Sequence, residues 1–267
     1  MDEISHDLSP AALATANEAN QSELFALFGR WHRAEIHDDA ELLWGISDVP
    51  FPMFNFILRA QLALSHVDAA IDAAIERGKS HHVPLMWITS PATRPTDLGT
   101  RLEAHGFTPE GGATGMAIDL LSLAPNSPMP TGLIIERVEK DYLTLSKVCV
   151  TGFKMPEFVV EPMSQLLNCL GTEVRIRHYL GKLDGEPVAC SMLYLGAGVA
   201  GIYNVTTLPQ ARGSGIGAAM TFAPLRDAHD LGYRVGILQA SKMGLPVYRR
   251  LGFQENFQYS QYIWMES

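Results

Sequence analysis

The chain has 267 residues, of which 47% are hydrophobic, 18% charged and 9% aromatic. This composition excludes an intrinsically disordered or low-complexity chain, and the length allows one large domain or two ordinary ones. The 29 acidic and 20 basic residues give a net charge of -9, the wrong sign for binding nucleic acid or an anionic membrane. The acidic N-terminus and the lack of a long apolar run favour a cytoplasmic protein with no signal peptide or membrane span.

The cysteines and histidines show no metal-binding pattern. Cys149, Cys169 and Cys190 form no Cys-x-x-Cys pair, and their odd number disfavours a disulfide framework. The nine histidines have no spacing that brings three or four ligands together. We therefore expect reduced, buried cysteines and no metal site.

A proline-rich segment divides the chain. Three prolines between Pro125 and Pro130 disfavour helix and central strand, so residues 125–131 are predicted to be an extended linker between domains 1–124 and 132–267. The part up to Pro130 holds 17 acidic and 7 basic residues, and the remainder holds 12 acidic and 13 basic residues. A polyanionic ligand such as a nucleotide is therefore expected on the second domain.

Hydrophobic periodicity and turn residues predict the elements of both domains. In the first domain they predict a helix, a strand, a helix and a strand, at residues 10–31, 85–89, 97–105 and 116–120. In the second they predict a strand, two helices and a three-stranded meander, and then a helix, a strand, a helix and a strand. These span residues 132–138, 141–152, 156–170, 174–182, 187–195, 199–207, 214–231, 234–240, 244–251 and 254–264. This order predicts a mixed α/β fold.

Two short segments resemble each other. Residues 102–107 (Leu-Glu-Ala-His-Gly-Phe) and 248–253 (Tyr-Arg-Arg-Leu-Gly-Phe) each follow one predicted strand and precede another. A Gly-Phe helix exit also arises by chance, so coincidence is the alternative. We interpret the pair as a distant internal repeat, which predicts two related domains.

The most informative segment is a glycine-rich loop after the predicted strand 199–207. It reads Pro209-Gln210-Ala211-Arg212-Gly213-Ser214-Gly215-Ile216-Gly217-Ala218. Glycines between a strand and a helix let the backbone approach a ligand, and the first N–H groups of the helix can bind a phosphate. The alternative is a tight turn without a ligand.

The loop also fits the dinucleotide-binding pattern G-x-G-x-x-G/A over residues 213–218. That pattern directly follows its first strand, whereas residues 209–212 intervene here, and no acid stands at a strand end about 20 residues on. The Tyr-x-x-x-Lys pair of short-chain dehydrogenases is missing too, because Gly252 stands four residues after Tyr248. An NAD(P)-dependent oxidoreductase is therefore the less favoured alternative.

The sequence resembles the GNAT superfamily of acyl-CoA-dependent N-acetyltransferases. The family's loop, Gln/Arg-x-x-Gly-x-Gly/Ala, is met by Gln210, Gly213 and Gly215. A second element, with Ser241 where Asn or Ser is usual and the ending Tyr-x-x-Leu-Gly-Phe, looks like the family's following strand and helix. The resemblance covers residues 132–264 and is weak in the first domain. It implies an α+β fold with a mixed, mostly antiparallel sheet flanked by helices, and, with the repeat, two tandem GNAT-like domains of which the first is degenerate.

The resemblance also assigns roles. The amides of the glycine loop would bind the pyrophosphate of acetyl-CoA, and the preceding strand would pair with the pantetheine arm, with the Thr207 amide polarising the acyl carbonyl. Tyr248 matches the tyrosine that protonates the departing thiolate. The implied cofactor-binding residues are Val205, Thr206, Thr207, Gln210, Arg212, Gly213, Ser214, Gly215, Ile216, Gly217, Ala218 and Ser241. Arg212, Lys242 and Arg250 are candidates for the adenosine phosphates, with solvated surface charges as the alternative.

Other roles stay open. Tyr248 is alternatively a packed aromatic, and His178, which alternates with apolar residues along its strand, is more typical of a core histidine than of a general base. Glu157, Glu161 and Glu173 lie in the segment that borders the acceptor site in the family. A water-mediated proton route is a further alternative.

These observations predict an acetyl-CoA-dependent N-acetyltransferase, monomeric or homodimeric, that acetylates a primary amine of a small molecule or peptide by direct attack. One acyl-CoA site per chain is expected, because the first domain has no counterpart of the glycine loop. Its acidity favours a cationic acceptor. The alternative from another class is a catalytically silent acyl-CoA-binding or sensor module.

Overall fold

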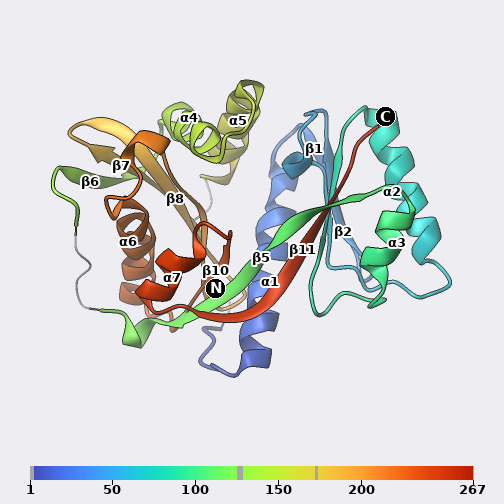
Figure 1. Cartoon of the computed structure of the whole chain (residues 1–267), viewed down its shortest axis with the longest axis horizontal. Helices are drawn as coiled ribbons and strands as arrows, with labels where there is room; N and C mark the ends of the chain where they lie inside the picture. The colour runs from blue at the N-terminus through green and yellow to red at the C-terminus, as the bar shows by residue number, and fades with distance from the viewer. Residues whose placement is uncertain (1–2, 125–128, 172–173, 267) are drawn as a thin grey trace. The chain divides into compact units, whose positions relative to one another are not determined.

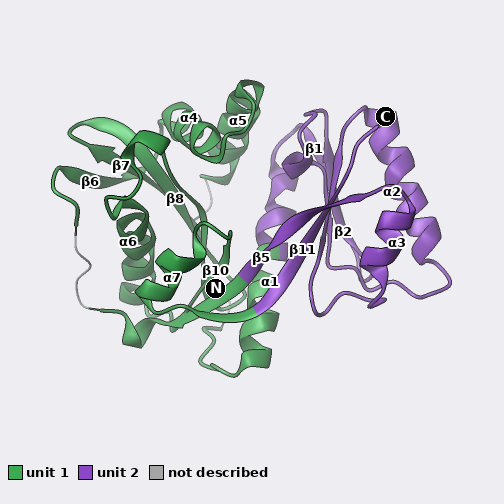
Figure 2. Cartoon of the chain, viewed as in Figure 1, with its two compact units in different colours: residues 1–21, 115–256 green, residues 22–114, 257–267 purple. Residues whose placement is uncertain are grey.

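The computed structural model describes residues 3–124, 129–171 and 174–266 (Figure 1). The chain divides into two compact units, coloured separately in Figure 2. Unit 1 comprises residues 1–21 and 115–256, and unit 2 comprises residues 22–114 and 257–267. Residues 125–128 of the expected linker lie outside the described part of the chain.

The units divide the chain at other positions than the boundaries expected from sequence at residues 124 and 132. Most of α1 (Pro10–Ala26) lies in unit 1, because its Leu13 and Ala16 pack on an apolar cluster there. Strands β5 (Thr108–Asp119) and β11 (Gln254–Trp264) each run from one unit into the other. The described residues on either side of positions 125–128 in the proline-rich segment, 115–124 and 129–131, both belong to unit 1.

The sheet of unit 1 has the strand order β5-β10-β9-β8-β7-β6. Its strands besides β5 are β6 (Leu133–Val138), β7 (Ile176–Leu183), β8 (Glu186–Gly196), β9 (Val199–Thr207) and β10 (Val235–Ala240). Strands β6 to β9 are antiparallel neighbours, and β9 and β10 are parallel. Asp184 and Gly185 turn the β7–β8 hairpin with φ values of 51° and 92°, as the Asp-Gly sequence predicts.

Helices cover both faces of this sheet. On β7, His178 contacts Tyr142 of α4 (Tyr142–Phe153), whereas the next residue, Tyr179, donates to Asp227 of α6 (Ile216–Asp230) at 2.6 Å. Because neighbouring side chains of a strand point to opposite faces, α4 and α6 lie on opposite sides. Helix α5 (Val160–Leu170) packs beside α4, and α7 (Leu245–Leu251) packs beside α6 (Figure 1).

Unit 2 contains β1 (Ala34–Asp38), β2 (Leu43–Ser47), β3 (Phe56–Leu58) and β4 (Leu85–Thr89), which with β11 have the strand order β1-β2-β3-β4-β11. Its helices are α2 (Val67–His81) and α3 (Leu98–Ala104). The side chains of Trp87, Leu98 and Phe107 lie in its core. Short 3-10 turns occupy Leu27–Arg30, Pro52–Phe54, Leu120–Ser122, Glu157–Val159 and Pro209–Ala211 in the two units.

The two units repeat one pattern, which confirms the predicted tandem arrangement. The order β3-α2-β4-α3-β5 of unit 2 matches β9-α6-β10-α7-β11, and the pairs β3–β4 and β9–β10 are both parallel. Gly106 and Gly252 end α3 and α7 with φ values of 89° and 99°. The phenylalanine after each glycine is buried, so the short sequence echo marks the same structural position twice.

The described residues contain no helix long and apolar enough to cross a membrane, and no group of three His, Cys, Asp or Glu side chains placed to hold a metal ion. Cys149 and Cys190 are buried as predicted, whereas Cys169 is half-buried because it lies near the end of α5. None of the three forms a disulfide.

Candidate functional site

Strands β9 and β10 separate toward the end of β9. They pair only over Ala200–Ile202 against Gly236–Leu238, while β9 runs on to Thr207. The far edge of residues 203–207 therefore has no paired strand among the described residues. An unpaired strand edge inside a sheet offers backbone N–H and C=O groups to an extended ligand.

A β-bulge bends β9 at this opening. Cys190 faces Thr206 on β9 but Met192 faces Tyr203, so Asn204 and Val205 share the position opposite one residue of β8. Asn204 has a φ of 52°, in the left-handed region that asparagine tolerates better than most residues. Such bulges increase the local twist of a strand and re-aim its groups.

The amide of Thr207 points into the opening. Leu208 N donates to Val188 O of β8 at 2.8 Å, and Ala189 faces Thr207. Because hydrogen-bonded and non-hydrogen-bonded pairs alternate along antiparallel strands, Thr207 directs both its N–H and its C=O away from β8.

The glycine loop leaves a row of amides without acceptors. Arg212 N donates to Pro209 O at 3.4 Å and Ala219 N to Gly215 O at 3.1 Å. Between these two, the amides of residues 213–218 find no acceptor among the described residues. The first N–H groups of a helix have no intrahelical partner, and here α6 begins directly after the loop.

Two glycines make this arrangement of the 213–218 amides possible, which we call the phosphate cradle. Gly213 and Gly215 have φ values of 82° and 86°, a region that other L-residues rarely adopt. A β-carbon on Gly213 would have no atom within 4 Å, so the space in front of the loop is open. Exposed N–H groups together with the dipole of α6 form the type of site that binds phosphate.

The other predicted cofactor residues occupy different positions. Val205 and Thr207 are half-buried at the opening, whereas Thr206 is buried. Gln210 is exposed, and Ser241 is exposed at the end of β10, where its Oγ accepts from Gly244 N at 3.2 Å. Ser241 therefore starts the turn into α7.

Arg212 points into the fold. Its Nε donates to Thr207 O at 2.9 Å, and its Nη2 donates to Gly152 O at 2.8 Å. Lys242 and Arg250, the other cations considered for the adenosine phosphates, are exposed on the segments around α7.

Tyr248 lies on α7 and is 8% exposed. Its ring packs edge-on against Phe253, with centroids 5.9 Å apart, and closely against Gly244. Its hydroxyl has no hydrogen-bond partner among the described residues. Burial raises the pKa of Tyr248 to about 12, so the phenol stays protonated at neutral pH.

His178 is a core residue. It is 2% exposed, its Nε2 has no partner in the described part of the chain, and burial lowers its pKa to about 4. A base with so low a pKa holds no proton at neutral pH. Glu157 and Glu161 are exposed before and within α5, and Glu173 lies outside the described residues.

Two contributors to the site were not predicted from sequence. Asn204 forms the bulge, and its residue type at a left-handed position was the available signal. Gly152 lies at the end of α4, where a β-carbon would come within 2.7 Å of Thr206 Cγ2. Only glycine lets α4 approach β9 so closely, and nothing in the local sequence indicated that contact.

The equivalent connection in unit 2 lacks a cradle. Residues 59–66, between β3 and α2, contain no glycine. Gln61 N donates to Glu41 O at 2.8 Å and Leu62 N to Arg94 O at 3.0 Å, so these amides are already bonded. This connection does not reproduce the anion-binding geometry of the glycine loop.

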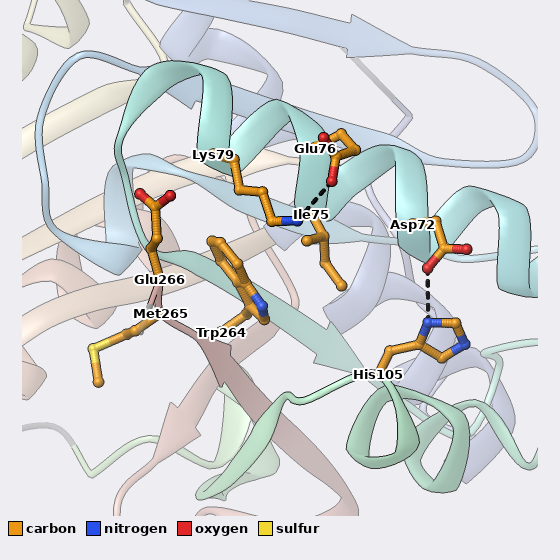
Figure 3. A pocket seen from close by; sticks show the side chains of 8 residues that line it. All are labelled: Asp72, Ile75, Glu76, Lys79, His105, Trp264, Met265 and Glu266. Carbon is orange, nitrogen blue, oxygen red and sulfur yellow. Dashed lines mark hydrogen bonds and ion pairs between the residues drawn. The ribbon is translucent and has the colours of Figure 1, made fainter.

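A cavity of about 680 Å³ lies in unit 2 (Figure 3). Its charges are largely paired: His105 bonds Asp72 at 2.9 Å, and Lys79 Nζ lies 2.7 Å from Glu76. A second cavity, of about 460 Å³, lies in unit 1 beside Tyr142 and His178. Both are lined by residues other than those of the β9–β10 opening and the glycine loop.

A family comparison matches the segment that contains this geometry. Residues 147–236, which include β9, the glycine loop and α6, match the family model described as an acetyltransferase (GNAT) domain. Over these residues, unit 1 is similar to a GNAT acetyltransferase domain.

Solved structures extend the likeness over the whole chain. A GCN5-related N-acetyltransferase from Kribbella flavida is 18% identical, with a TM-score of 0.68 over 94% of this chain and 96% of its own. A tandem GNAT protein from the clavulanic acid biosynthesis pathway is 13% identical, with a TM-score of 0.62 over 98% and 96%. A GCN5-related N-acetyltransferase from Sphaerobacter thermophilus is 17% identical, with a TM-score of 0.61 over 96% and 93%. These likenesses establish a tandem GNAT fold; a sequence search of curated proteins found no match.

Proposed function

We propose that unit 1 transfers an acetyl group from acetyl-CoA to a primary amine of a small molecule or peptide. The observation that carries this proposal is the row of amides at residues 213–218, next to the edge of β9 at residues 203–207. Neither has a partner in the described part of the chain, and both lie within the segment that matches the acetyltransferase family. A phosphate-binding helix start beside an open strand edge fits a ligand that has a pyrophosphate and an extended amide-containing arm.

When bound, acetyl-CoA supplies a thioester that a neutral amine can attack. The amides of the glycine loop bind its pyrophosphate, and the free edge of residues 203–207 orients its arm. Thr207 N–H, aimed into the opening, donates to the acyl oxygen and stabilises the charge that develops there.

Tyr248 holds the proton for the leaving thiolate. Its raised pKa keeps the phenol protonated, and its hydroxyl is not engaged by another described residue. A protonated donor of this kind lowers the barrier for expelling a thiolate. The amine loses its proton through water or an exposed carboxylate such as Glu157, because buried His178 lies in the core beside Tyr142.

The charge of the protein favours a cationic acceptor. The residues up to Pro130 carry 17 acidic and 7 basic side chains, and opposite charge raises the encounter rate with a cation. Polyamines, basic antibiotics and lysine side chains belong to this chemical class.

The direct test combines ligand binding with transfer. Acetyl-CoA and CoA are expected to raise the melting temperature, whereas NAD and NADPH are not, because only ligands of the folded state stabilise it. A panel of amines is then incubated with acetyl-CoA, and acetylated product is sought by mass spectrometry. Binding without transfer to any amine would favour the silent CoA-binding module, and stabilisation by NAD alone would favour the oxidoreductase.

A further inference from the structure

We propose that Arg212 is a positioning residue of the acyl site and not a phosphate ligand. Its guanidinium holds the last peptide group of β9 against the end of α4, and so fixes the direction of the Thr207 amide relative to the glycine loop. This inference rests on the proposed function, because it names a further residue of the same site.

The Arg212 side chain bonds back to the end of β9, within the connection between β9 and α6. The residue follows the 3-10 turn Pro209–Ala211 and folds back so that Nε donates to Thr207 O at 2.9 Å. The start of the glycine loop is thereby tied to the end of the strand that precedes it. Because Arg212 directly precedes Gly213, this one bond joins the start of the proposed phosphate site to the edge of β9.

The peptide group between Thr207 and Leu208 is held from both sides. Its N–H donates to Val188 O of β8 at 2.8 Å, and its C=O accepts from Arg212 at 2.9 Å. With this peptide plane fixed, rotation about the Thr207 backbone is restricted. The Thr207 N–H, which lies on the same edge of the strand as its C=O, then keeps its direction into the opening.

The second bond of Arg212 reaches α4. Its Nη2 donates to Gly152 O at 2.8 Å, in the last turn of a helix whose final carbonyls lack intrahelical partners. A positive charge at a helix C-terminus is also favourable. Gly152 in turn lies against Thr206 with no room for a side chain. One arginine thus joins the end of β9, the end of α4 and the glycine loop.

This arrangement fits neither role that the sequence left open for Arg212, a phosphate ligand or a solvated surface charge. A phosphate ligand would direct its guanidinium toward the open space in front of Gly213, whereas two donor groups of Arg212 are bonded to carbonyls of the protein. Replacing it should therefore disturb the acyl carbonyl more than the phosphates.

The test compares Arg212→Met with Arg212→Lys, and uses Arg226→Met as a matched control at an arginine on the exposed side of α6 that pairs with Asp230. Three quantities are measured: the dissociation constant of acetyl-CoA by calorimetry, kcat, and the infrared carbonyl band of bound, carbonyl-labelled acetyl-CoA. In the wild type the band is expected at lower frequency than in solution, because a hydrogen bond polarises the carbonyl.

For Arg212→Met we expect an acetyl-CoA affinity within about threefold of wild type, loss of the band shift, and a kcat lower by about 100-fold, the cost typical of a misplacement near 1 Å. Arg212→Lys, which can donate to one of the two carbonyls, should recover part of the shift and of kcat. Arg226→Met should match the wild type.

If Arg212→Met loses more than tenfold in acetyl-CoA affinity with an unchanged carbonyl band, Arg212 is a phosphate ligand and the inference is overturned. If Arg212→Met keeps both the wild-type band and the wild-type kcat, the inference is also overturned. If Arg212→Met does not fold, the decision passes to Arg212→Lys: a wild-type band and kcat in that variant would overturn the inference. A wild type that binds no acetyl-CoA would instead contradict the proposed function itself.

Discussion

The hydroxyl of Tyr203 on β9 donates to Oδ1 of Asn20 on α1 at 2.7 Å. The same asparagine donates from Nδ2 to Gly196 O at 2.8 Å and to Val199 O at 3.4 Å, and its side chain is fully buried. A residue near the start of the chain therefore supports the β8–β9 turn and the strand β9, where we propose the acyl site. This relationship explains why the first 21 residues belong to unit 1.

Replacing Asn20 by alanine should lower the free energy of unfolding by about 2 to 3 kcal/mol. The change removes three hydrogen bonds and leaves buried polar groups without partners, which costs more than the bonds contribute on average. Urea denaturation measures the effect. Thr15→Ala, at an exposed position of the same helix, is the control and should change stability by less than about 0.5 kcal/mol. Equal effects of the two substitutions would show that the hydrogen bonds of Asn20 do not stabilise the fold.

Gly215→Ala should weaken acetyl-CoA binding at least about tenfold, since a side chain would enter the phosphate cradle and strain a residue with a φ of 86°. Gly232→Ala is a matched control, because Gly232 follows the other end of α6 with a φ of 88° and open space around it. Both variants carry the same backbone strain, and only Gly215→Ala should lose affinity in calorimetry. Equal affinity in both variants would remove the loop from the binding site.

Tyr248→Phe should lower kcat by about 100-fold with little change in acetyl-CoA affinity, because it removes the proton donor and keeps the ring. The raised pKa, about 12, also predicts that kcat of the wild type does not fall through ionisation of this phenol between pH 8 and about 10. Steady-state kinetics with a slow amine measure both, with Tyr262→Phe of unit 2 as control. A normal kcat in Tyr248→Phe would reduce this tyrosine to a packing role.

His178 should make the protein less stable in acid. The unfolded chain binds a proton at this residue below pH 6.5, and the folded chain only near pH 4, so the free energy of unfolding falls as the pH drops between these values. The loss amounts to at most about 3 kcal/mol. Denaturation at pH 7 and pH 4.5 should show a smaller decrease for His178→Gln than for wild type. His229→Gln, at a half-exposed position of α6, should behave like wild type. An identical decrease in all three proteins would contradict the assignment.

Much of unit 1 was predictable from its sequence. Strand β9 and strand β11 have the predicted bounds. The predicted helix 141–152 corresponds to α4, which begins one residue later, with Asp141 as its cap and Oδ1 accepting from Thr144 N at 3.1 Å. The glycine loop was predictable too, because its residue types are demanded by local backbone geometry. Structural features that depend only on neighbouring residues can be predicted from a single sequence.

Features that depend on distant contacts were not predictable. Strands β1, β2 and β3 and helix α2 were not predicted from the sequence. Strand β3, for example, has only three residues, and its pairing with the distant strand β4 defines it. The predicted helix 10–31 ends earlier, at Ala26, and continues as a 3-10 turn. The hydrogen bond from Arg212 to Gly152 O and the close approach of Gly152 to Thr206 depend on how α4 packs against β9. No local residue pattern predicts that packing.

The most direct measurement of the central claim is the stoichiometry of acetyl-CoA binding to the intact chain by titration calorimetry. One site per chain is predicted, because the amides of residues 213–218 have no acceptor among the described residues, while Gln61 N and Leu62 N in the equivalent connection of unit 2 are bonded. The double variant Gly213→Ala, Gly215→Ala should abolish the binding. A stoichiometry near two, or unchanged binding in the double variant, would contradict the location of the acyl site in the glycine loop of unit 1.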